Sequence, residues 1–171
     1  MLRLASLTLA LALSLAALAP ASAQDDVISY GSDDPAMNEA IRSAQSHLGR
    51  VLVAAINEVG VAHPALSLKV AFPVEAEDMN AEVIWVDEIS LAQEGMAGKL
   101  ANEPVNMPGL HLGDEVHFSQ EMIYDWGLVG PDGKVFGHYT TRVLIETLPE
   151  AQAAPIREAL SDTPLPAAWQ E

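Results

Sequence analysis

A change of hydrophobic period is the feature that most constrains the fold of this chain. From Met37 to Ile56, apolar residues recur at three- and four-residue spacing, which is typical of one buried helix face. Asp34 and Pro35 precede this run and fit the N-cap and the first helical position. From Leu66 onward the period drops to two residues, as it does in half-buried strands. The pattern therefore predicts a long helix followed by a sheet.

Turn residues divide the rest of the chain into short segments. The helix is expected to end near Gly60, and Pro73 is expected to stop the first strand. A second helix is predicted from Tyr139 to Leu148, before Pro149, and a short helix near 155–160 precedes a frayed tail. The second and third strands, joined by a short connection, should pair as a hairpin. The predicted strands are 66–72, 81–89, 95–101, 115–118 and 123–129, with a short strand or loop at 134–137.

This order predicts an α+β fold. A long N-terminal helix packs on a strongly bent, mainly antiparallel sheet of about five strands, with a second helix near the C-terminus. A single domain is expected over residues 34–148, with a short helix and frayed tail over 149–171. The sequence shows no internal repeat and no second domain.

The N-terminus has the signature of a secretory signal peptide. A positive start ending at Arg3 leads into an apolar run, and Ala21-Ser22-Ala23 supplies small residues before Gln24. The alternative is a membrane anchor, but a span needs about 20 apolar residues and Pro20 interrupts this shorter run. Residues 1–23 are therefore predicted to be removed after Ala23, which leaves a leader over 24–33 and no transmembrane segment. A periplasmic or secreted location is expected.

Composition narrows the classes of partner. The chain carries 24 acidic and 8 basic residues, so the net charge of −16 becomes −17 once Arg3 is lost with the signal peptide. Such a charge repels nucleic acid and favours either a basic protein partner or simple solubility. The chain has no cysteine, which excludes thiol chemistry and disulfides.

Several short motifs concentrate between Gly98 and Arg142, and together they resemble one family. They are Ile84-Trp85-Val86, Gly98-Lys99-Leu100-Ala101-Asn102-Glu103-Pro104, Leu112-Gly113-Asp114-Glu115-Val116, Ile123-Tyr124-Asp125-Trp126 and Gly137-His138-Tyr139-Thr140-Thr141-Arg142. Their order is similar to that of the YegJ-like bacterial domain of unknown function (domain of unknown function 2314), over roughly Ala36 to Leu148. The resemblance implies a small, secreted α+β domain. It implies no established activity or cofactor.

Catalytic motifs with a fixed spacing are missing from the sequence. His111 and His117 lie six residues apart and match no metal-binding spacing, so neither a metal nor a cofactor is predicted. Ser119, His138 and Asp125 contain the residue types of a hydrolytic triad, but no nucleophile elbow surrounds the serine, which fits a helix cap. No phosphate-binding glycine loop is present.

The polar residues of this central stretch remain as candidate binding residues. An arginine near an aspartate can form a bidentate ion pair, so Arg142 is predicted to pair with Asp125 first and with Glu103 second, with Trp126 packed nearby. The pair is interpreted either as a structural tie for the second helix or as a ligand clamp. The full candidate set is Asn102, Glu103, Asp125, Trp126, His138, Thr140 and Arg142.

Two functions from different classes are consistent with these observations. The first is a non-enzymatic binding or interaction domain of the cell envelope, with a basic protein as its partner. The second is a small hydrolase of envelope material that acts through His138 with Asp125 or Glu103. Convergence of His138, Asp125 and a partner such as Asn102 or Ser119 in an open cleft would favour the hydrolase. Whether the protein is an enzyme stays open at this point.

Overall fold

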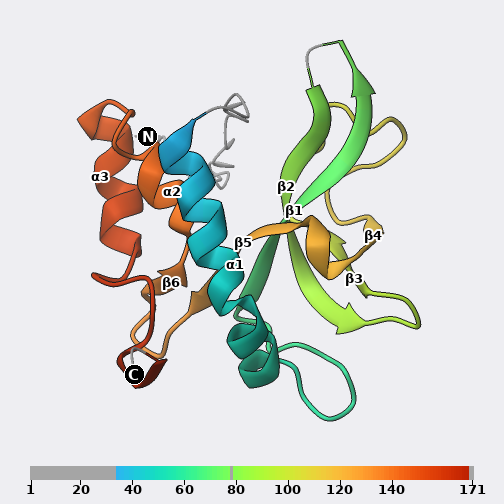
Figure 1. Ribbon diagram of the computed structural model, residues 1–171, viewed down its shortest axis with the longest axis horizontal. Coiled ribbons are helices and arrows are strands. Elements are labelled where there is room, and N and C mark those ends of the chain that lie inside the picture. Colours follow the sequence, from blue (N-terminus) through green and yellow to red (C-terminus); the bar gives the residue numbers. More distant parts are fainter. Residues whose placement is uncertain (1–33, 78, 170–171) are drawn as a thin grey trace, which may run out of the picture.

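The computed structural model describes residues 34–77 and 79–169, so the predicted signal peptide and leader lie outside the described residues. This part of the chain forms one open antiparallel sheet in the order β4-β3-β2-β1-β5-β6, together with helices (Figure 1). The α+β prediction is confirmed. The sheet has six strands where about five were expected, because the ambiguous segment near residue 135 pairs with β5. The elements are α1 (Pro35–Ala55), β1 (Leu66–Ala76), β2 (Met79–Leu91), β3 (Met96–Leu100), β4 (Glu115–Phe118), the 3-10 helix η1 (Gln120–Met122), β5 (Ile123–Val129), β6 (Val135–Gly137), α2 (Tyr139–Leu144), α3 (Glu150–Ala159) and the 3-10 helix η2 (Ala167–Trp169).

The first helix begins where its cap residues predict. The Asp34 carboxylate accepts hydrogen bonds from the backbone N–H groups of Ala36, at 2.8 Å, and Met37, at 3.1 Å. The helix ends before Gly60 because the chain becomes extended at Ile56, which bridges to Ala62. Its buried stripe faces the sheet and consists of Ala40, Ala44, Leu48, Val51 and Ala55.

The main core lies between α1 and the sheet. Leu68 on β1 is paired with Val86 on β2 and with Trp126 on β5, and all three side chains are fully buried. The indole N–H of Trp126 donates to the carbonyl of Ala44 at 3.0 Å, which joins the helix to the sheet. Burial of such large side chains is the dominant stabilising contribution to the fold. In Figure 1, α1 crosses β5 and the β1–β2 hairpin projects away from the helices.

Prolines define element ends differently from what the sequence predicted. β1 was expected to stop at Pro73, but it continues to Ala76 and pairs Pro73 with Ala81. Beyond Val70 this strand pairs with β2 alone, so one edge is free and a residue without an N–H group is tolerated there. At the other end of the chain, Pro149 is the N-cap residue of α3, with Pro155 inside that helix.

The second helix is shorter than expected. α2 was predicted to continue to Leu148, but its last turn tightens, because Glu146 and Thr147 donate to the carbonyls three residues earlier, Val143 and Leu144. Pro149 therefore starts a new helix instead of ending the old one. α3 and α2 share a small second core with β6, made of Ile145, Ala153 and Leu160.

The residues after α3 return across the molecule. A frayed tail was expected here, but Leu165 and Trp169 pack against the main core, and Trp169 lies 6.5 Å from Trp126 between ring centroids. Arg50 on α1 donates to the carbonyl of Trp169 at 2.7 Å. In the part of the chain that the structure describes, no helix is both long enough and apolar enough to cross a membrane.

Candidate functional site

The junction of β5 and α2 brings several of the predicted site residues together. Asp125 lies on β5 opposite Lys69 of β1 and is fully buried. One carboxylate oxygen accepts from both the backbone N–H and the hydroxyl of Thr140, each at 2.7 Å. The other accepts from the N–H of Trp126 at 2.8 Å. Asp125 thus fixes the first turn of α2 to the sheet.

Lys69 completes this polar network. Its ammonium donates to the Thr140 hydroxyl at 3.3 Å and lies 5.6 Å from the centre of the Trp85 ring. Burial raises the pKa of Asp125, whereas its hydrogen bonds from Thr140 and Trp126 and the charge of Lys69 lower it. Thr140 is only 4% exposed, so its hydroxyl is not accessible to a substrate. The contacts of this cluster are those of a structural tie.

His138 lies over the adjoining part of the sheet in a left-handed backbone conformation, with φ 51°. Its ring stacks on Trp85 with 4.4 Å between centroids, and Nδ1 is 3.1 Å from the hydroxyl of Thr141. Burial, together with the charges of Lys69 and Arg142, lowers the pKa of His138 to about 4. A Cβ at Gly127 would be 2.5 Å from the His138 ring, so the ring needs a glycine beneath it.

The hydrolase arrangement is not assembled. Both Asp125 oxygens are occupied by Thr140 and Trp126, and His138 makes its hydrogen bond with Thr141 instead of with Asp125. Ser119 stands at the N-cap position of η1. Acid–base catalysis needs the two groups in hydrogen-bond reach or one water apart, and no direct hydrogen bond joins Asp125 and His138.

The predicted ion pair of Arg142 is wrong. Its guanidinium donates to the Gly137 carbonyl at 2.9 Å, to the Ser161 carbonyl at 2.9 Å and to the Ser161 hydroxyl at 3.1 Å. Arg142 therefore ties α2 to the segment after α3, while Asp125 is satisfied by neutral donors. The prediction failed because nothing in the sequence indicated that Ser161 would return to this position. Trp126 does pack nearby, since a Cβ on Gly137 would meet its ring.

Asn102 and Glu103 belong to a different part of the molecule, the long connection between β3 and β4. The Glu103 carboxylate accepts from the N–H of Leu112 and contacts the His111 ring, each at 2.9 Å. Both contacts lower the pKa of Glu103, and the pair with Glu103 raises the pKa of His111. These residues shape the loop. Among the residues that the structure describes, no cluster of His, Cys, Asp and Glu is placed to hold a metal ion.

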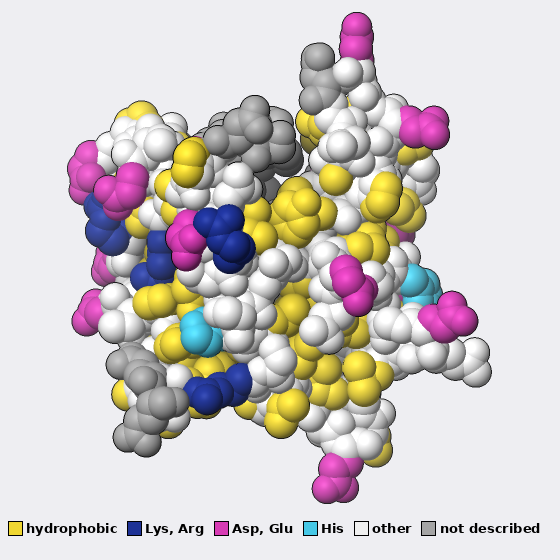
Figure 2. Space-filling model, in the orientation of Figure 1, with side chains coloured by type: hydrophobic (Ala, Val, Ile, Leu, Met, Phe, Trp, Pro, Cys, Tyr) yellow, Lys and Arg dark blue, Asp and Glu magenta, His cyan; other side chains and the backbone are white. Residues whose placement is uncertain are grey.

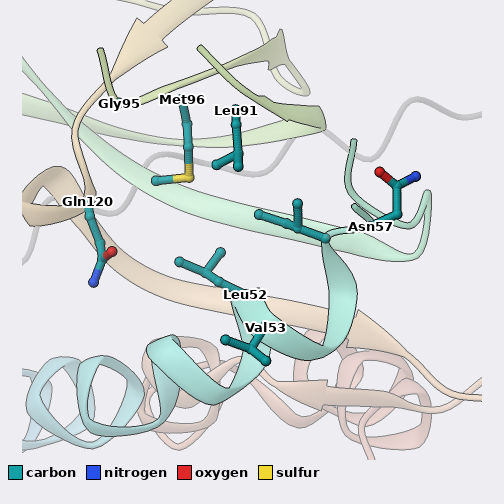
Figure 3. Close-up of a pocket in the computed structure, with 8 residues that line it drawn as sticks. Leu52, Val53, Asn57, Leu91, Gly95, Met96 and Gln120 are labelled. Carbon is teal, nitrogen blue, oxygen red and sulfur yellow. The ribbon is translucent and has the colours of Figure 1, made fainter. Parts of the chain in front are cut away.

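A second candidate site, which the sequence did not indicate, is an apolar groove between the C-terminal end of α1 and the β2–β3 hairpin. Its volume is about 400 Å³. Figure 3 shows Leu91 and Met96 reaching from the hairpin toward Leu52, with Asn57 and Gln120 at opposite ends. The described residues that line it are Leu52, Val53, Ile56, Asn57, Leu91, Gly95, Met96 and Gln120, none of which is charged.

The apolar surface continues beyond the groove. Val53 is 85% exposed and Leu91 57%, and the adjoining turn adds Val59 and Val61, at 82% and 49%. Gly60 packs on Leu91, and Val61 bridges to Ser90, so the turn that carries Val59 and Val61 lies beside Leu91 at the edge of the groove. Figure 2 shows hydrophobic side chains gathered in this region of the molecule. Exposed patches of this kind mark interaction sites more often than plain surface.

Glutamates adjoin the groove in sequence. Glu58 follows Asn57, Glu94 precedes Gly95 and Glu121 follows Gln120, and all three glutamates are exposed. A hydrogen bond from Ser119 lowers the pKa of Glu121. The groove is therefore lined by uncharged residues, and three exposed glutamates lie next to lining residues in the chain.

One sequence signal could have revealed this site. Val51, Leu52 and Val53 are consecutive, so they cannot all face the core of one helix. Val51 is fully buried, whereas Val53 points into solvent. An apolar residue off the buried stripe, at the end of a helix, is the sequence signal of this surface.

The described residues form a small α+β domain with one open antiparallel sheet. Residues 34–160 match the family described as "Uncharacterized protein conserved in bacteria (DUF2314)", and the chain belongs to this family. It is 26% identical over 136 residues, which cover 80% of this chain and 84% of the relative, to "Uncharacterized protein YegJ" of Escherichia coli (strain K12). No solved structure matches the chain.

Proposed function

We propose that this protein is an exported binding domain of the cell envelope, which docks a basic protein partner in the groove between α1 and the β2–β3 hairpin. The observation that carries the proposal is an uncharged, apolar groove with exposed valine and leucine side chains, whose lining residues have exposed glutamates as neighbours in the chain. Burying the patch supplies affinity, since apolar area contributes about 25 cal/mol per Å². The negative charge of the chain, −16 overall, favours a basic partner and speeds its encounter.

Export is supported by the sequence alone. The small residues Ala21-Ser22-Ala23 follow a short apolar run, as in a cleavable signal peptide. Intact mass of the protein recovered from the periplasm should correspond to a chain that begins at Gln24. Recovery of the uncleaved chain from the membrane fraction would overturn this part of the proposal.

The alternative, hydrolysis of envelope material through His138 and Asp125, gains no support from the geometry. The two side chains make their hydrogen bonds with different partners, and the neighbouring Thr140 hydroxyl is buried. A nucleophile must reach its substrate. The groove is therefore the better basis for a function.

Docking is tested by photo-crosslinking at single positions. A photoreactive amino acid replaces Val53 at the groove or Val105, which is 72% exposed on the β3–β4 connection, as the matched control. In envelope extract of the source bacterium, the probe at Val53 should give one discrete adduct with a basic protein, and the yield should fall at high salt because screening weakens charge steering. Equal labelling from Val53 and Val105, or none from either, would refute groove docking.

A further inference from the structure

The backbone of the groove walls restricts what can bind there. β3 is paired with β2 on one side and with β4 on the other, so it offers no free edge. The end of β2 is also paired on both sides, because Leu91 faces Met96 and also donates to the Gly60 carbonyl at 2.7 Å. The strands at the ends of the sheet are β4 and β6, and neither contributes a residue to the lining.

The remaining wall is the C-terminal end of α1, and the backbone N–H groups there are also hydrogen-bonded already. The Ile56 N–H, which follows α1, donates to Leu52 at 2.9 Å, and the Asn57 N–H donates to Val61 at 3.0 Å. A partner strand would find no backbone ladder to join in this groove and would bury its own N–H and C=O groups without partners. Each such group costs about 1–3 kcal/mol. A helix satisfies these groups internally, so it can enter an apolar groove without that cost.

The shape of the groove suits a helix that lies beside α1. Leu52, Val53 and Ile56 form a ridge along the last turns of α1, and Leu91 and Met96 form the facing wall. Helices that pack side by side insert such ridges into each other's grooves at axis separations of about 8–10 Å. The occupant would present apolar residues at three- and four-residue spacing.

The negative charge of the protein favours a basic helix over an acidic one as the occupant of the groove. Glu58, Glu94 and Glu121 adjoin the lining at three separate points of the chain. A helix with lysine or arginine beside its apolar stripe would approach these carboxylates, whereas a second copy of this chain would bring further acidic residues. Like charges in contact disfavour association, so a basic partner fits better than self-association.

We infer that the occupant of the groove is a basic amphipathic helix of a partner protein, a conclusion that rests on the proposed docking function. The helix lies along the C-terminal turns of α1, packs its apolar stripe on the exposed side chains of Val53 and Leu91, and places its basic residues near Glu58, Glu94 and Glu121.

Two synthetic peptides of identical leucine and lysine composition provide the test. One places leucine at helical spacing, and the other alternates leucine with lysine at the two-residue period of a strand. Fluorescence anisotropy with the mature protein should give at least about tenfold tighter binding of the helical peptide, equivalent to about 1.4 kcal/mol. Circular dichroism of the complex should show helix induced in that peptide.

Matched variants locate the binding site. Val53→Glu should weaken binding of the helical peptide at least about tenfold, because it places a charge in the apolar contact. Val105→Glu adds the same charge away from the groove and should leave binding unchanged. Both side chains are exposed, so neither substitution disturbs the core.

The outcomes separate this inference from the docking proposal. Tighter binding of the alternating peptide, with the same loss in Val53→Glu, would overturn the helix while leaving groove docking intact. Equal loss in both variants, or no binding of either peptide, would also overturn the helix, and crosslinking at Val53 would then decide docking by itself. A dimer in sedimentation velocity that dissociates in Val53→Glu would assign the groove to a second copy and refute the inference.

Discussion

His138 is kept neutral by its surroundings, and this makes the stability of the protein depend on pH. Its pKa is lowered from 6.5 to about 4 by burial against Trp85 and by the charges of Lys69 and Arg142. Between these two pH values the unfolded chain binds a proton that the folded chain does not. Stability therefore falls as the pH decreases from 6.5 to about 4 and then levels off.

The first prediction follows from this shift. Between pH 7.5 and pH 5, His138 should account for a loss of about 2 kcal/mol in the free energy of unfolding. His138→Asn removes the titrating group and retains a residue that tolerates the left-handed conformation. Urea denaturation at both pH values should show a smaller loss in the variant. An unchanged loss would mean that other groups cause the acid sensitivity.

Arg142 is the second residue whose role is testable, because its three hydrogen bonds reach Gly137 and Ser161. Arg142→Ala should lower the free energy of unfolding by about 2–4 kcal/mol, since the acceptors lose charged donors. Chemical denaturation measures this loss. Arg42→Ala is the matched control, because Arg42 pairs with Glu39 on an exposed helix surface, where such pairs contribute under about 1 kcal/mol. Equal effects of the two substitutions would contradict the assigned tie.

At the scale of elements, the connection between β3 and β4 is held by one buried side chain. Glu82 on β2 is 1% exposed, and its carboxylate accepts from the N–H groups of Val105 and Asn106 at 2.7 and 2.6 Å. The single carboxylate supplies the acceptors that these two N–H groups lack, because the loop has no backbone partner for them. Loss of Glu82 should therefore loosen this loop before it loosens the sheet.

Glu82→Ala is predicted to destabilise the protein by about 2–4 kcal/mol, through two donors left without a partner. Hydrogen exchange should locate the effect, with protection lost at Val105 and Asn106 and retained at Leu68 in the central strand. Glu88→Ala, which removes an exposed carboxylate of the same strand together with its surface ion pair to Lys99, serves as the control. Uniform loss of protection across the sheet would show that Glu82 supports the core instead.

The elements were predictable from the sequence to the extent that local chemistry decides them. Asp34 and Pro35 start α1 as expected, and β4 and β5 have the predicted bounds, because period and turn residues act within a few positions. Pro73 was misjudged because its tolerance depends on whether β5 still pairs with β1 at that point. That pairing is a tertiary property, which no window of sequence contains.

The candidate sites depended even more on tertiary structure. Asp125 and Thr140, both in the candidate set, hydrogen-bond to each other, whereas His138 stacks on Trp85. The partner of Arg142 lies nineteen positions away, across α3, and could not be foreseen. The groove combines α1 with the hairpin of β2 and β3 and with η1, so it exists only once the chain has folded.

At the scale of the whole molecule, the large negative charge affects folding and docking in opposite directions. A net charge of −16 repels itself in the folded state, and salt relieves this repulsion. The attraction between this acidic protein and a basic partner is screened by the same ions. Changing the salt concentration therefore separates the effect of charge on the stability of the fold from its effect on binding in the groove.

The final prediction uses this contrast. Raising sodium chloride from about 20 to about 500 mM shortens the Debye length from over 20 Å to under 5 Å. Thermal unfolding of the mature protein should then shift upward by about 3 °C, as self-repulsion worth under 1 kcal/mol is removed. Over the same range, the helical leucine–lysine peptide should bind at least about tenfold more weakly. Chloride is preferred to sulfate, which stabilises proteins by exclusion from their surface.

A melting temperature that falls with salt would show that attractive ion pairs outweigh repulsion in the fold. Binding that is insensitive to salt would leave the apolar patch as the sole basis of recognition and remove the case for a basic partner.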